Sequence, residues 1–290
     1  DELARIAAPT AMIWGRHDLA TPLPVAEAAA QRFGWPLHVI DAAADDPAMD
    51  QPATFVRVLR AVCAVDCGRI VNPEVVRQQE DVGLKGITDG EFRRYMFHVD
   101  FLEQLEGVAV IEGDFLARFH RTDGTEIEFS PPTMHVEAPI RHVRPIQGAD
   151  YDFLAAQVTK TPKVSIPAPS MLHFRGGRKG ISEEVYPDLE QFFDDLTAAY
   201  REEIADLASR GARYVQMDDT NLAYLCDPEV RARTAARGDD PDELTRLYSR
   251  MVSDAFEGRP DDMTAAIHLC RGNFQSAWVT QGGYEPVAEI

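Results

Sequence analysis

The chain has 290 residues, 45% of them hydrophobic and 27% charged, so it can form one large domain or two smaller ones. Its formal net charge of -19 argues against a nucleic-acid partner or an anionic membrane surface, because both need a basic footprint. Four cysteines are too few for a disulfide scaffold, no apolar run reaches the roughly 20 residues of a membrane helix, and the first residues form no signal peptide. We therefore expect a cytoplasmic location.

The first 62 residues predict a short α/β segment of strand, helix, strand and helix. The Ala-rich first helix ends at a Gly, the residue favoured just after a helix. The expected elements are a strand at 10–14, a helix at 25–33, a strand at 36–40 and a helix at 53–62. Residues 63–71 show no clear periodicity and are predicted to form a junction.

A second pattern begins at Asn72, a good N-cap residue that is followed by Pro73 at the first helical position. This signal predicts a helix up to Gly83, and a strand follows at 85–89. Between 107 and 144 only short alternating stretches occur, and we expect a β-hairpin excursion in a long loop there.

The clearest alternation of strands and helices lies after residue 162. Both long helices carry apolar residues at the spacing of one helical face, which is typical of helices packed on a sheet. The predicted elements are a strand at 163–167, a helix at 188–210, a strand at 213–218, a helix at 241–258 and a strand at 264–270. Strands that alternate with long helices indicate parallel pairing, so the predicted fold class is α/β.

Polar side chains gather where the predicted strands end. Asp89 and Glu91 follow one strand, Asp218 and Asp219 follow another, and His268 and Cys270 close a third. In parallel α/β proteins the active site forms at the carboxyl ends of the strands. A doubly wound sheet would show the same pattern, so alternation alone does not distinguish it from a barrel.

His268 and Cys270 are candidate zinc ligands. They are two positions apart on a strand, so their side chains leave on the same face, and an imidazole with a thiolate suits zinc. A packed His beside a buried Cys would show the same spacing. Two ligands are also fewer than the four of a tetrahedral site.

The carboxylates of Glu91 and Asp218 are candidates for binding a substrate ammonium or for acid–base chemistry. The competing interpretation is a helix N-cap, which fits Asp219 better than Asp218 because Asp218 ends the strand.

Several segments together resemble the single-barrel relatives of cobalamin-independent methionine synthase. They are residues 78–84, 87–93, 170–178, 214–227, 268–274 and 282–287. The resemblance implies a (β/α)₈ TIM barrel with a catalytic zinc, which holds the homocysteine thiol as the thiolate that attacks the methyl group of a methyl-folate. It implies that His268 and Cys270 bind the zinc and that Glu91 and Asp218 bind the amine of homocysteine.

The sequence departs from this family at both ends. A Glu and a Cys that complete the zinc site in the family would lie beyond Ile290, and the family's first strand is replaced. We therefore expect an incomplete barrel with about five of the eight strands, and little or no activity from this chain alone.

The replacement resembles the carboxyl-terminal end of an α/β-hydrolase. Asp18 matches the acid of the hydrolase triad, but Asp45 stands where the catalytic His is expected, and the chain has no G-x-S-x-G nucleophile elbow. A working serine hydrolase is therefore not expected, and Asp18 is predicted to be structural.

The sequence thus predicts a hydrolase-like fragment at 1–62, a junction at 63–71 and a methionine-synthase-like zinc barrel at 72–290. The implied function is zinc-dependent methyl transfer to homocysteine in methionine biosynthesis, with small molecules as partners. The alternatives are zinc-thiolate alkyl transfer to another substrate such as an epoxide, a hydrolase remnant, and a non-catalytic fusion fragment.

Overall fold

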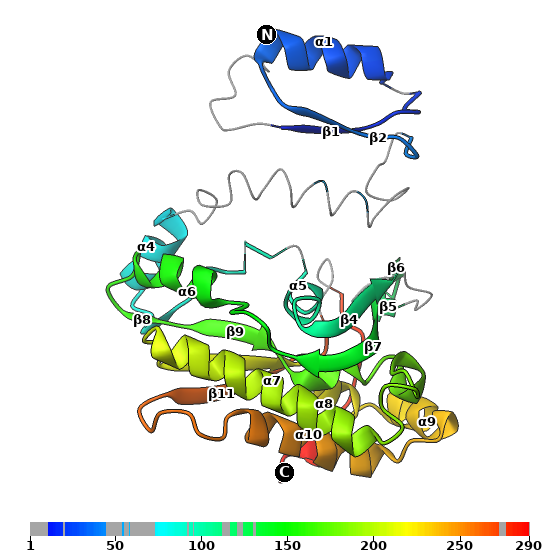
Figure 1. Cartoon of the computed structure of the whole chain (residues 1–290), viewed down its shortest axis with the longest axis vertical. Coiled ribbons are helices and arrows are strands. Elements are labelled where there is room, and N and C mark those ends of the chain that lie inside the picture. Colours follow the sequence, from blue (N-terminus) through cyan, green and yellow to red (C-terminus); the bar gives the residue numbers. More distant parts are fainter. Residues whose placement is uncertain are drawn as a thin grey trace. The chain divides into compact units, whose positions relative to one another are not determined.

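A computed structural model describes residues 11–19, 21–44, 73–91, 93–94, 96–111, 117–120, 124–129, 132–272 and 277–289, together with positions 54 and 58. The chain divides into two compact units, Asp1–Val71 and Asn72–Ile290, which are described separately below (Figure 1). Among the described residues, no helix has the length and apolar character needed to cross a membrane.

The first unit contains two parallel strands and a helix, β1 (Met12–Gly15), α1 (Leu23–Phe33) and β2 (Leu37–Ile40). Gly34 ends the helix in the left-handed conformation with φ 69°, as the sequence predicted. Asp18 is buried and accepts a hydrogen bond from the Thr21 backbone N at 2.7 Å, which is a structural role. Asp45 lies outside the described residues, as does most of the predicted helix at 53–62. The hydrolase resemblance stays a prediction.

The second unit is built on a three-stranded parallel sheet in the order β11–β10–β9. Its strands are β9 (Val164–Pro167), β10 (Tyr214–Asp219) and β11 (Thr264–Leu269). A second parallel pair joins β3 (Gly86–Ile87) to β8 (Thr161–Pro162). The mixed α/β class and the parallel pairing are confirmed. The strands of the described residues form separate sheets, and the incomplete barrel remains a prediction.

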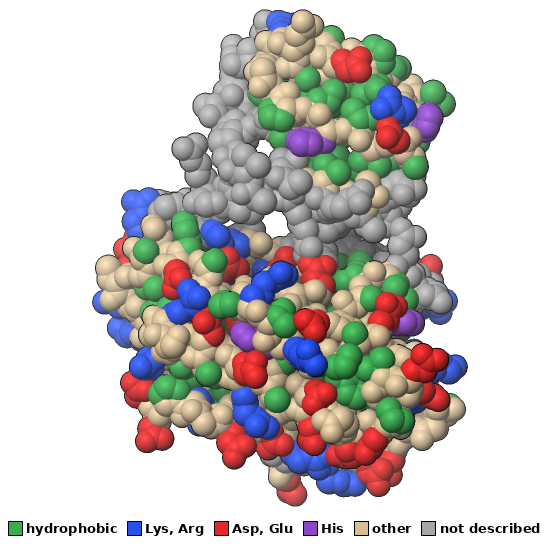
Figure 2. Space-filling view, in the orientation of Figure 1, with side chains coloured by type: hydrophobic (Ala, Val, Ile, Leu, Met, Phe, Trp, Pro, Cys, Tyr) green, Lys and Arg blue, Asp and Glu red, His purple; other side chains and the backbone are tan. Residues whose placement is uncertain are grey.

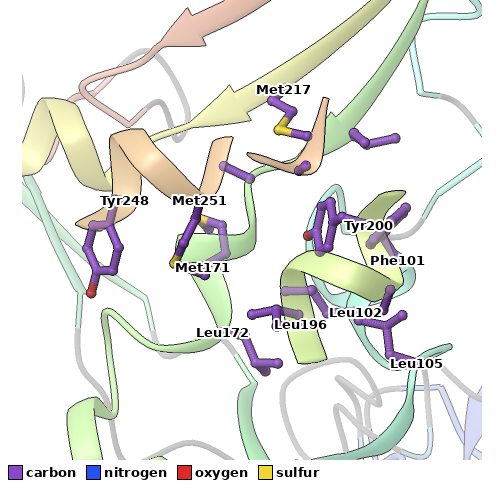
Figure 3. Packing of buried hydrophobic residues seen from close by; sticks show 14 of the residues in the cluster. Phe101, Leu102, Leu105, Met171, Leu172, Leu196, Tyr200, Met217, Tyr248 and Met251 are labelled. Atoms are coloured by element: carbon purple, nitrogen blue, oxygen red, sulfur yellow. The ribbon is translucent and has the colours of Figure 1, made fainter. Parts of the chain in front are cut away.

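Two long helices cover one face of the three-stranded sheet, α7 (Leu189–Ser209) and α10 (Pro241–Ala255). Each begins at an Asp whose side chain accepts from backbone N–H groups of the first turn, Asp188 for α7 and Asp240 for α10. Figure 3 shows part of the resulting core, to which β10 contributes Met217, α7 contributes Leu196 and Tyr200, and α10 contributes Tyr248 and Met251. Burial of this apolar face fixes the helices on the sheet.

The remaining helices are short. They are α4 (Pro73–Asp81), α5 (Val99–Leu102), α6 (Gly148–Ala155), α8 (Asn221–Tyr224), α9 (Pro228–Arg237) and the 3₁₀ turns η3 (Pro169–Leu172), η4 (Gly177–Gly180) and η5 (Glu285–Val287). The sequence predicted α4 but not α6 or α9. The signals for α9 were present, since Asp227 caps it, Pro228 occupies its first turn and Gly238 ends it with φ 102°.

The region between 107 and 144 is more regular than expected. It contains two antiparallel pairs, β4 (Glu106–Ile111) with β7 (Thr133–Arg141), and β5 (Ala117–His120) with β6 (Glu126–Phe129). The predicted hairpin excursion is confirmed.

On the face shown in Figure 2, acidic and basic side chains are interspersed, although the sequence as a whole is acidic.

A fully buried carboxylate ties α7 to the segment after β7. Glu203 accepts hydrogen bonds from the backbone N of Ile146 at 2.9 Å and of Gln147 at 2.7 Å, and its Oε2 lies 2.7 Å from His142 Nε2. The hydrogen bond to Glu203 raises the pKa of His142, opposed by burial and helped by the charges of Glu203, Glu202 and Asp206. These contacts fix the loop that leads into α6.

We predict that the His142–Glu203 pair stabilises the second unit more at low pH than at high pH. A raised pKa in the folded state adds stability that is complete below the unfolded value of about 6.5 and is lost as pH rises through the folded value. His142→Gln should therefore lower the free energy of unfolding more at about pH 5.5 than at about pH 8.5 in urea titrations. Glu202→Gln, at an exposed position 3.6 Å from His142, is the control and should have a smaller effect. An equal loss for His142→Gln at both pH values would contradict this prediction.

Candidate active site

The three-stranded sheet has one apolar face and one polar face. Side chains alternate along β10, so Val215, Met217 and Asp219 are buried against the helices while Gln216 and Asp218 point the other way. In the parallel register Asp218 is paired with Pro167 of β9 and with His268 of β11. Paired residues on neighbouring strands share a face, so Asp218 and His268 lie on the polar face together.

Glu91 is brought to this polar face by a tight turn after β3. Its φ is 60°, in the left-handed region that a non-Gly residue adopts only when its surroundings hold it there. The Asp89 carboxylate accepts from the Glu91 backbone N at 3.0 Å, and the Ser165 hydroxyl of β9 donates to Glu91 Oε1 at 2.7 Å. The strained turn and the Ser165 contact together place the Glu91 carboxylate over the sheet.

Asp218 lies in a partly dehydrated environment beside Glu91. Burial raises the pKa of Asp218 above its ordinary value, and the Glu91 charge raises it further. Gln216, whose Nε2 donates to Asp218 Oδ1 at 2.6 Å, lowers the pKa, as do the charges of His268 and Arg94. Two carboxylates that interact across a half-buried site attract a cationic group such as an ammonium.

Asp219 has a structural role on the opposite face. It is fully buried, and it accepts from the Leu222 backbone N at 2.7 Å and from the Ser170 hydroxyl at 2.9 Å. Burial raises its pKa, and these hydrogen bonds lower it. Thr220 is the N-cap residue of α8, and Asp219 precedes it. The contact with Leu222 lies in the first turn of α8, so Asp219, and not Asp218, supports the start of this helix.

The two adjacent aspartates should respond differently to substitution. Asp219→Ala leaves two buried donors without an acceptor and should lower the free energy of unfolding by about 2 to 3 kcal/mol. Asp218→Ala relieves a dehydrated charge and should change stability by less than about 0.5 kcal/mol, or increase it. Urea unfolding of the two variants measures the difference, and similar losses for both would refute the division of roles.

His268 and Cys270 offer a zinc ion donors of suitable types. His268 is exposed on β11, and Cys270 is a free thiol whose backbone N donates to the Asp219 carbonyl at 3.3 Å. Strand alternation directs the His268 side chain to the polar face, and Cys270 is the first residue after β11. Within the described part of the chain, no three His, Cys, Asp or Glu side chains form a group that could hold a metal. The donor chemistry fits zinc, and the described residues supply only part of a tetrahedral set.

Cys226 is not an evident third ligand. Its thiol is buried and donates to the Leu222 carbonyl at 3.3 Å, within its own helical turn. Burial raises the pKa of this thiol, which opposes the thiolate form that binds metal. Cys226 is therefore a free cysteine packed in the interior of the unit.

Sequence reasoning missed the residues that hold the carboxylates in place. Ser165 lies on the polar face of β9, Arg94 lies three residues after Glu91, and Gln147 precedes α6. Only the short spacing between Glu91 and Arg94 could have been noticed in the sequence. The other contacts join positions more than 50 residues apart.

Similar proteins were found by sequence and by structure. No family model matches the chain. The uncharacterized protein YxjG of Bacillus subtilis (strain 168) is 38% identical over 246 residues, which are 82% of this chain and 63% of YxjG. The chain therefore spans less than two thirds of this relative. A homocysteine methyltransferase of Thermosynechococcus vestitus, which uses 5-methyltetrahydropteroyltriglutamate, is 28% identical over 148 residues, 51% of this chain and 18% of that enzyme.

A solved structure is also similar to this chain. A Listeria monocytogenes protein provisionally assigned as a vitamin-B12-independent methionine synthase matches with a TM-score of 0.55 and 33% identity, over 74% of this chain and 56% of that protein. The fold is methionine-synthase-like. This likeness supports the predicted family at the level of the fold.

Proposed function

We propose that the second unit carries the homocysteine site of a zinc-dependent thiol methyltransferase. The observation that supports this most directly is the gathering of Glu91, Asp218 and His268 on one face of a parallel sheet, at the carboxyl ends of its strands. The methionine-synthase-like fold and the methyltransferase relative point to the same chemistry.

In this proposal Glu91 and Asp218 form the amine seat, the pair of carboxylates that binds the ammonium of homocysteine. Their mutual repulsion is relieved when a cation lies between them, which makes ammonium binding favourable. Ser165 orients Glu91, and Gln216 orients Asp218, so the seat is formed before the substrate arrives. The bound amine then fixes the direction in which the thiol extends.

His268 and Cys270 would hold the zinc, with further donors supplied from outside the described residues. When bound, zinc lowers the pKa of a substrate thiol so that the nucleophilic thiolate is present at neutral pH. In methyl transfer, the thiolate sulfur forms a bond to the methyl carbon while the bond from that carbon to the donor breaks. Its electron pair stays on the donor, which takes up a proton equivalent to the one that the thiol lost. We propose that the methyl donor is of the methyl-folate type. We also propose that the second unit forms part of a (β/α)₈ barrel and that the protein is cytoplasmic.

The zinc proposal predicts a metal content that depends on the two donors. The purified full chain, loaded with zinc and desalted, should retain about one zinc per chain by elemental analysis. Cys270→Ser and His268→Gln should each lower zinc affinity by about tenfold or more, because each removes one ligand. Cys226→Ser is the matched control, because the Cys226 thiol is hydrogen-bonded to the Leu222 carbonyl, and this variant should retain zinc. Retention of zinc by Cys270→Ser would exclude this site.

The amine-seat proposal predicts an effect on substrate binding. Glu91→Gln removes one charge from the seat and should weaken the binding of homocysteine, measured by calorimetry, by about tenfold. Glu137→Gln, at an exposed position, should leave binding unchanged. Mass spectrometry of the thioether product tests the reaction itself. Methionine formed from a methyl-folate supports the proposal, whereas a thioether formed only from an epoxide favours alkyl transfer.

A further inference from the structure

Arg94 is a buried cation beside the amine seat. Its side chain is 3% exposed, and its Nη2 donates to Gln147 Oε1 at 2.8 Å and to the Ser165 carbonyl at 2.5 Å. Its Nη1 lies 3.7 Å from Glu91 Oε1. Among the described residues, Nε and Nη1 have no hydrogen-bond partner. A buried guanidinium with unsatisfied donors is costly unless nearby negative charge compensates it.

The contacts of Arg94 connect it to both the turn and the sheet. Its backbone N donates to the Glu91 carbonyl at 2.9 Å, so it closes the strained turn that carries Glu91. The Ser165 residue whose carbonyl it binds is also the residue whose hydroxyl holds the Glu91 carboxylate. On the other side, Gln147 is fixed by the bond from its backbone N to the buried Glu203. Arg94 is therefore held by two rigid elements.

The amine seat and Arg94 together carry a net charge that one ammonium group can neutralise. Glu91 and Asp218 carry two negative charges and Arg94 one positive charge, so the group keeps one net negative charge, which one ammonium neutralises. We propose that Arg94 is a positioning residue that acts through Glu91, and that its charge makes the amine seat prefer a zwitterionic amino acid over a simple amine. This inference rests on the proposed function of Glu91 and Asp218.

The preference follows from Coulomb's law in a half-buried site. A ligand with both an ammonium and a carboxylate brings its carboxylate close to two protein carboxylates, and Arg94 offsets that repulsion. Without the Arg94 charge, a simple amine is attracted more strongly and the carboxylate of an amino acid is repelled more strongly. A purely structural role would weaken both kinds of ligand by the same factor.

The test compares two probe ligands by calorimetry with the purified full chain. These are L-methionine, which is zwitterionic, and methylthiopropylamine, which has the same thioether and amine but no carboxylate. For Arg94→Gln we expect the ratio of methionine affinity to amine affinity to fall by about tenfold. Arg94→Lys keeps the charge and should keep the wild-type ratio, even if both affinities fall.

Two further variants distinguish an effect of the Arg94 charge from an effect of its structural contacts. Arg93→Gln removes the same charge from the neighbouring residue, whose Nε binds Asp150, and should leave the ratio unchanged. Gln147→Glu keeps an acceptor for Arg94 Nη2 and places a negative charge that offsets the charge of Arg94. It should therefore lower the ratio of methionine affinity to amine affinity, as Arg94→Gln does. This variant replaces Arg94→Gln in the test if Arg94→Gln does not fold.

The outcomes distinguish this inference from the proposed function. If the wild-type chain binds both ligands and neither Arg94→Gln nor Gln147→Glu changes the ratio, the role of Arg94 is refuted while the amine seat stands. If the wild-type chain binds neither ligand, the amine seat itself is refuted.

Discussion

The alternation of side chains along β10, with a parallel strand on each side, is the constraint on which this unit depends. It buries Met217 and Asp219 against the helices and turns Asp218 to the opposite face, although the two aspartates are adjacent in the sequence. The same register sets His268 beside Asp218. One face of the sheet is therefore packed against the helices, while on the other face the Asp218 carboxylate stays partly exposed.

The carboxylates of this unit fall into two groups according to how many hydrogen-bond donors contact them. Glu203 and Asp219 are fully buried and accept several hydrogen bonds, so they connect elements of the fold. Asp218 and Glu91 have fewer hydrogen-bond donors, Gln216 and Ser165 respectively, and the charge of Glu91 raises the pKa of Asp218. This difference is the physical reason to assign structure to the first pair and ligand binding to the second.

Of the two proposed zinc ligands, His268 lies on β11 and Cys270 follows its last residue. This strand is at one edge of the described sheet, and its Ile267 is 44% exposed. An edge strand keeps one side open for another element. A complete metal site there needs donors from residues outside those described, whereas the carboxylate pair is already held from both sides by β9 and β10. The amine seat is thus the better-formed half of the proposed site.

The sequence by itself determined the α/β class and the positions of the main strands and helices, because hydrophobic period and capping residues are local signals. Short motifs led only to a prediction of the four candidate site residues. It left α6 and α9 unassigned, and it favoured Asp218 over Asp219 as a site residue without fixing the face of the sheet on which either side chain lies. Only the tertiary structure placed Ser165, Gln147 and Arg94 around Glu91. Those contacts join segments far apart in the chain, and their geometry depends on strand register and on the left-handed turn at Glu91, which no local pattern specifies.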